Sequence, residues 1–235
     1  MVAGLLTTAL VEPADRTDGL KPKSNDHFRD AWRTLCRDRR FRCLAIVGML
    51  CMSGQLLFPH YQALARDQLN APNLILMVWV VVQNAGAGLF SFMAGILADR
   101  FGNRLAVHLE IAILSVTPLL AICLAGGLLA GGASFFWITF FLLGLTPSTM
   151  KTLVNYTLEM LSQPEHPRYI STLKLCMAVP IVLSPLIGLL VDIVGFSSVF
   201  VAITCLIAAG GLLAFQLVEP QHELERSPTG WSSEP

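Results

Sequence analysis

Residues 73–104 read NLILMVWVVVQNAGAGLFSFMAGILADRFGNR, a long apolar run that is followed by a short charged loop. No charged side chain occurs between residues 74 and 97. A bilayer core about 30 Å thick needs roughly 20 apolar residues of helix, because lipid offers no partner for free backbone groups. The run therefore predicts a transmembrane helix, and the loop after it marks a membrane surface.

The composition of the whole chain indicates a lipid environment. Hydrophobic residues make up 54% of it, charged residues 14%, and the mean hydropathy is +0.63. Such a chain has too little polar surface to cover a soluble globule. The formal net charge is zero, so the basic excess that a nucleic-acid partner requires is missing. The six cysteines form no C-x-x-C pair, and neither a metal site nor a cofactor is predicted.

Five further apolar runs have the length of a membrane span. We predict an all-α fold, a polytopic transmembrane bundle with spans at residues 43–63, 74–97, 105–127, 134–157, 172–193 and 197–218. The loops at 64–73, 128–133 and 194–196 are short, so consecutive helices are expected to pack as neighbours.

Lysine and arginine are unevenly distributed between the two sides of this predicted bundle. Nine of the sixteen precede the first span, whereas the three short loops contain Arg66 alone. Cytoplasmic loops retain an excess of these residues. We therefore predict a multi-pass integral protein of the plasma (inner) membrane with both termini in the cytoplasm.

The segment before the first span has its own pattern. Residues 26–42 read DHFRDAWRTLCRDRRFR, in which Phe28, Trp32 and Leu35 fall at helical spacing. A stripe of arginines lies beside them, at Arg29, Arg33, Arg37 and Arg40. This pattern is typical of a helix on the membrane surface with its arginines at the headgroups. A solvated basic linker helix is the alternative.

The charged loop after residue 94 combines two glycines with three charges, at Gly95, Asp99, Arg100, Gly102 and Arg104. Gly95 permits close helix packing, Gly102 permits a tight turn, and Asp99 is placed to cap the next helix. An ordinary polar hairpin is the alternative. The pattern G-x-x-x-D-R-x-G-x-[RK] resembles the cytoplasmic gating motif of the major facilitator superfamily. The stretches NYTLEM at 155–160 and PLIGLLVDIVGFSSVF at 185–200 resemble later parts of such transporters.

That resemblance implies a transporter of twelve spans in two six-span halves. The string VAGLLTTALVEP at residues 2–13 returns as AGGLLAFQLVEP at residues 209–220, which are corresponding points of two repeats. We therefore expect the chain to be the C-terminal half. Its expected parts are residues 1–13, the end of a preceding span; 14–42, a cytoplasmic linker; 43–218, the six-span bundle; and 219–235, a cytoplasmic tail. A second half or a homodimer is expected to complete it.

Polar side chains inside the predicted spans are candidates for a transport cavity, because they are costly in lipid. These candidates are Gln55, Gln83, Asn84, Lys151 and Asn155. Hydrogen bonding between helices is the alternative for the first three, and Lys151 could instead extend its long stem to the membrane surface. Glu110 could titrate in a proton-coupled cycle, or pair with the nearby arginines.

The function predicted from these features is transport of a small solute by alternating access, as half of a secondary transporter. The chain is not expected to be an enzyme, since no pair of catalytic groups is evident at one depth. A non-transporting membrane scaffold or remnant is the alternative. Flux measured after reconstitution separates the two.

Overall fold

The computed structural model describes residues 24–129, 131–161 and 163–217. These residues form helices and turns without any strand, which confirms the all-α class for this part of the chain. The expected helix remnant at 1–13, the first part of the 14–42 linker and the tail at 219–235 lie outside the described residues. The elements are α2 (Ser24–Arg37), α3 (Arg39–Met52), η1 (Ser53–Leu57), α4 (Phe58–Leu69), α5 (Asn73–Phe101), α6 (Asn103–Ala125), α7 (Gly132–Phe135), α8 (Trp137–Leu143), α9 (Leu145–Glu159), η2 (Gln163–Glu165), α10 (His166–Val182) and α11 (Ser184–Ala214).

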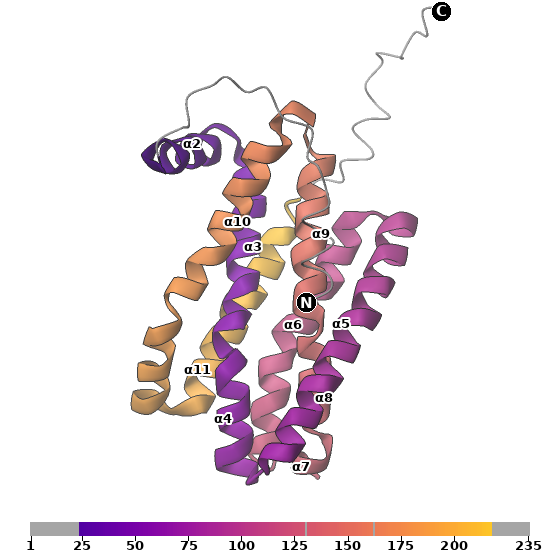
Figure 1. Ribbon diagram of the computed structural model, residues 1–235, viewed down its shortest axis with the longest axis vertical. Helices are drawn as coiled ribbons and strands as arrows, with labels where there is room; N and C mark the ends of the chain where they lie inside the picture. Colours follow the sequence, from indigo (N-terminus) through magenta and orange to yellow (C-terminus); the bar gives the residue numbers. More distant parts are fainter. Residues whose placement is uncertain (1–23, 130, 162, 218–235) are drawn as a thin grey trace, which may run out of the picture.

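The helices from α3 onward lie side by side along one long axis (Figure 1). Four helical stretches are long and apolar enough to cross a membrane, namely Arg39–Leu69, Asn73–Phe101, Asn103–Ala125 and Gln163–Ala214. The first three contain the spans predicted at 43–63 and 74–97 and most of the span predicted at 105–127. Six membrane crossings remain a prediction, because length and composition alone single out four stretches in the described part of the chain.

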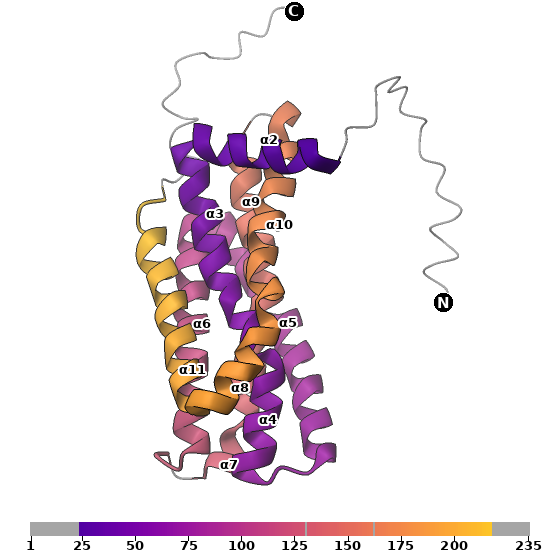
Figure 2. The ribbon, with the colours of Figure 1, turned by 90° about the vertical axis from the view of Figure 1, so that its left-hand side faces the viewer.

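Two predicted spans differ from continuous helices. The region 134–157 is divided among α7, α8 and α9, with a break at Gly144. The region 172–193 is interrupted at Leu183, between Pro180 and Pro185, because proline lacks the N–H that a continuing helix needs. Gly195 has φ 80° and ψ 164°, a backbone conformation open to glycine, and the chain reverses direction between α10 and the end of α11 (Figure 2).

Two glycines bring α5 directly against the backbone of its neighbours. A Cβ atom on Gly144 would lie 2.4 Å from the carbonyl oxygen of Gln83, and one on Gly86 would lie 2.4 Å from that of Phe141. Side chains of any size are therefore excluded at both positions. Small residues allow membrane helices to approach closely where lipid gives no hydrophobic driving force. Trp79 of α5 packs against Phe136, just before α8, with the centroids of the two rings 5.3 Å apart.

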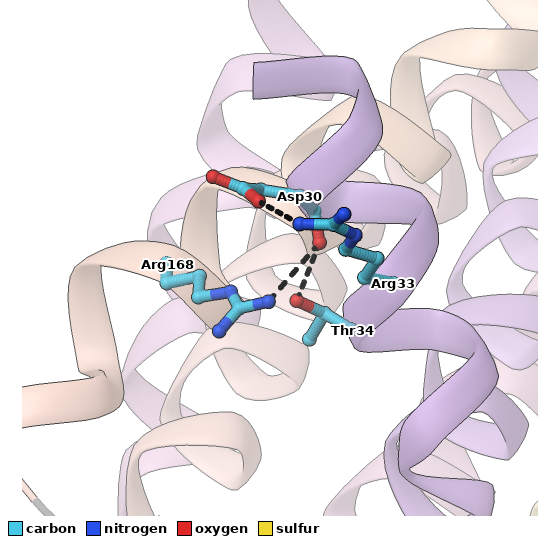
Figure 3. A network of polar contacts seen from close by, with 4 residues as sticks. All are labelled: Asp30, Arg33, Thr34 and Arg168. Atoms are coloured by element: carbon cyan, nitrogen blue, oxygen red, sulfur yellow. Dashed lines mark hydrogen bonds and ion pairs between the residues drawn. The ribbon is translucent and has the colours of Figure 1, made fainter. Parts of the chain in front are cut away.

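Helix α2 lies across one end of the bundle instead of along it (Figure 2). Its backbone is tied to α10, since the Arg168 guanidinium donates to the carbonyl oxygen of Asp30 at 3.4 Å (Figure 3). Thr34 donates to the same oxygen at 2.7 Å, and Arg33 approaches the Asp30 carboxylate at 3.9 Å. The cross-bundle orientation is the one expected of a helix on a membrane surface.

The predicted surface helix is shorter than the sequence pattern suggested. Asp38 has an extended backbone, and its carboxylate accepts hydrogen bonds from the amides of Arg40 and Phe41, which begins a new helix. Arg40 therefore lies on α3 and does not continue the arginine stripe of α2. The prediction was wrong there because the helical spacing of the arginines continues past Asp38, although the side chain of Asp38 favours the start of a new helix.

Candidate functional site

The loop between α5 and α6 is built on Gly102. This residue ends α5 with its amide donating to the carbonyl of Ala98, and its φ of 87° lies in the region that favours glycine. The predicted tight turn is therefore present. Asp99 was expected to cap α6, but Gly102 holds the cap position and no side chain bonds there. The expectation was wrong because α6 begins directly after the glycine, four residues beyond Asp99.

The outer face of this loop is uncovered by the described residues. Asp99 and Arg100 are both exposed. Gly95 is also exposed, and a Cβ atom there would meet nothing within 4 Å. The close helix packing predicted at Gly95 is thus not met within the described part of the chain.

The inner face of the loop is fastened to two other helices. The guanidinium of Arg104 donates to the carbonyl of Phe215, just after α11, at 3.1 Å. The amide of Asn103 donates to the Glu159 carboxylate, at the end of α9, at 2.6 Å. Asn103 is buried, and sequence analysis missed it. Its only signal was its place between Gly102 and Arg104, where the pattern accepts any residue.

Glu110 is a buried carboxylate at the interface of α6 and α9. One of its oxygens accepts hydrogen bonds from the hydroxyls of Ser148 at 2.8 Å and Thr152 at 3.3 Å. The other oxygen is buried and has no partner among the described residues. The alternative in which Glu110 pairs with nearby arginines is not what the structure shows. A carboxyl group held by two hydroxyls and no cation is able to exchange a proton if it gains access to water.

Gln55 lies at the junction of η1 and α9. Its side-chain amide is half-buried and approaches the sulfur atoms of Met52 and Met150, each at 3.5 Å. These contacts are weak, because a thioether is a poor hydrogen-bond acceptor. Gln55 therefore bridges two helices without having its hydrogen-bonding capacity filled, which fits both interhelical contact and cavity lining.

The other cavity candidates lie on α5 and α9. Lys151 and Asn155 are exposed and one helical turn apart, so they share a face of α9. Asn84 is exposed on α5, where its amide donates to the carbonyl of Val80 at 2.8 Å, and Gln83 is half-buried. Helices α5 and α9 stand together at the front of the bundle, with α6 and α11 behind them (Figure 1). The structure thus places these polar residues on a partly uncovered side.

The fold and these contacts agree with what the chain is similar to. Residues 43–233 match the family model described as Major Facilitator Superfamily. The chain belongs to the major facilitator superfamily. A curated relative is the tetracycline resistance protein, class C, of Escherichia coli, which is 27% identical over 141 residues. That match covers 57% of this chain and 32% of the relative, so the chain spans about a third of the length of the protein it matches.

Membership of the major facilitator superfamily confirms the resemblance predicted from residues 95–104. Together with the four long apolar helices it identifies a membrane protein. Members of the superfamily are transporters and not enzymes, in agreement with the prediction that no catalysis takes place here.

Proposed function

We propose that the chain is one half of a secondary transporter of the plasma membrane and moves a small solute by alternating access. A second six-helix unit, either another copy of this chain or a separate half, completes the pathway. Superfamily membership supports this proposal, as does the relative that is named a resistance protein. In transporters built from repeats, the substrate site lies at the interface of the repeats near the middle of the membrane.

The observation that carries the proposal is the polar face of α9. Lys151 and Asn155 are exposed within an apolar bundle, and a charged side chain facing lipid is costly. Neighbouring α5 is also uncovered. In its most apolar stretch 11% of the residues are buried, whereas 56% are buried in the corresponding stretch from α3 to α4. A second unit that covers α5 and encloses water beside α9 would bury the apolar face of α5. It would also place the charge of Lys151 in water and not in lipid. Gln55, Gln83, Asn84, Lys151 and Asn155 are then the cavity-lining residues.

Glu110 is the residue proposed to carry a proton in this cycle. It contacts α9, the helix that carries Lys151 and Asn155, through the buried hydroxyls of Ser148 and Thr152. A small rotation or shift of α9 would change which groups the carboxylate meets. Proton binding and helix movement would then be coupled through these two hydroxyls.

The first experiment asks whether the face of α9 meets water, and it needs no knowledge of the substrate. In a chain whose six cysteines are replaced by alanine, Asn155→Cys is treated with a membrane-impermeant maleimide in intact vesicles. We expect labelling at position 155 and none for the control Val116→Cys, which is exposed on α6 at 55% and expected to face lipid. Equal protection of both thiols would contradict a water-filled pathway beside α9.

The second experiment measures flux. Proteoliposomes contain either the chain alone or two copies fused in one polypeptide, and tetracycline is the first probe because of the name of the relative. Uptake that depends on the protein supports the transporter. Folded protein without flux for tetracycline or for a panel of other small solutes, in both forms, would favour the non-transporting scaffold.

A further inference from the structure

We propose that an anionic phospholipid binds in a groove beneath α2, with an acyl chain in the groove and its phosphate on Arg42. The site is separate from the proposed transport pathway. It would fasten the surface helix to the bundle through a lipid, in addition to the direct contact between Arg168 and Asp30.

The groove has a mostly apolar lining and room for part of an acyl chain. Its volume is about 250 Å³, and it lies between Trp32 and Leu35 of α2, Ile46 and Met49 of α3, and Cys176 of α10. Arg42 stands among these otherwise apolar residues. Because Ile46 and Met49 follow Arg42 by one and two helical turns, the apolar floor extends along α3 away from α2. The groove is therefore basic near α2 and apolar deeper along the bundle.

The groove is open at the side of the bundle and is not filled by the packing of α2. Trp32 is 69% exposed and Ile46 is 37% exposed, whereas Ala31 and Thr34 form the buried contacts of α2. Tryptophan is favoured at the level of lipid headgroups, where its ring meets the acyl boundary and its N–H meets water. Trp32 is therefore positioned as one wall of a lipid site.

The charges around the groove select an anionic headgroup. Arg37 and Arg42 are exposed on the adjoining parts of α2 and α3. Arg33 is exposed too but approaches the Asp30 carboxylate at 3.9 Å, and the Asp38 carboxylate accepts hydrogen bonds from the amides that begin α3. Basic side chains next to a membrane helix attract anionic lipids. A phosphate bound at Arg42 also satisfies the guanidinium by charge-assisted hydrogen bonds.

A photoreactive side chain at the wall of the groove identifies the occupant. p-Benzoylphenylalanine replaces Trp32, an aromatic residue that is 69% exposed, in the full chain, which is then reconstituted in vesicles with equal amounts of phosphatidylglycerol and phosphatidylcholine. We expect crosslinks to lipid with a preference for phosphatidylglycerol of about 5-fold, the factor that one arginine gives at a membrane surface. The same probe in place of Val116 should capture both lipids equally. Crosslinks at position 32 to residues 1–23 or to a second copy would overturn the proposal.

Two substitutions then separate the acyl site from the headgroup site. Ile46→Trp fills the groove and should remove one retained phosphatidylglycerol in native mass spectrometry, whereas Val116→Trp should not. Arg42→Gln should lower the preference between the two lipids but leave lipid capture, and the control Arg66→Gln should leave both unchanged. Unchanged retention in Ile46→Trp, or an unchanged preference in Arg42→Gln, would overturn the proposal.

Discussion

The hydrogen bond between Asn103 and Glu159 joins the loop motif to the end of α9. Asn103→Ala removes the donor and leaves a partly buried carboxylate without it, so we expect unfolding to become easier by about 1–3 kcal/mol. Thermal unfolding in detergent measures this, and Asn155→Ala, at an exposed position, is the control. A double-mutant cycle with Glu159→Ala isolates the pair. A coupling energy near zero would show that the contact does not hold the two helices together.

Glu110→Gln tests the proposed proton carrier with little change in shape. The new amide oxygen is still able to accept from Ser148 and Thr152, so the contact between α6 and α9 is kept. We expect flux in proteoliposomes to lose its response to an imposed proton gradient, while substrate binding is retained. Asp192→Asn, at an exposed carboxylate of α11, is the matched control. A response of unchanged size in Glu110→Gln would exclude this residue as the proton carrier.

At the scale of elements, the join of α5 and α6 depends on the backbone of Gly102. Gly102→Ala forces a side chain into φ 87°, and we expect the free energy of unfolding to fall by about 1 kcal/mol or more. Gly95→Ala is the matched control, since Gly95 is helical and its Cβ would meet nothing within 4 Å. Removing this helical glycine should raise stability by about 0.5–1 kcal/mol. Equal unfolding temperatures for both variants would contradict the strained turn.

The sequence predicts the helices best where a long apolar run has to cross lipid. Long apolar runs gave α5 and α6 close to their observed ends, because a lipid-exposed backbone has to satisfy its own hydrogen bonds. Pro180 and Pro185 mark the interruption at Leu183 in the sequence, because proline lacks a backbone N–H, whereas hydropathy does not show the break at Gly144, where the chain packs against α5. The cap at Asp38 was missed because the helical spacing of the arginines continues past it. Partners of buried polar groups, such as the hydroxyls on Glu110, depend on which helices meet, and one sequence does not contain that pairing.

At the scale of the whole molecule, the uncovered face of α5 is where a second unit is proposed to dock. Gly88 lies on this face, and a Cβ atom there would meet nothing within 4 Å, so Gly88→Trp fits within this chain but obstructs a neighbour. We expect flux by the fused double copy to fall by about tenfold or more, which corresponds to about 1.4 kcal/mol of lost association. Val116→Trp places the same ring at an exposed position of α6 and should leave flux unchanged. Equal flux from the two variants, with both folded, would show that α5 faces lipid and that the second unit meets this chain elsewhere.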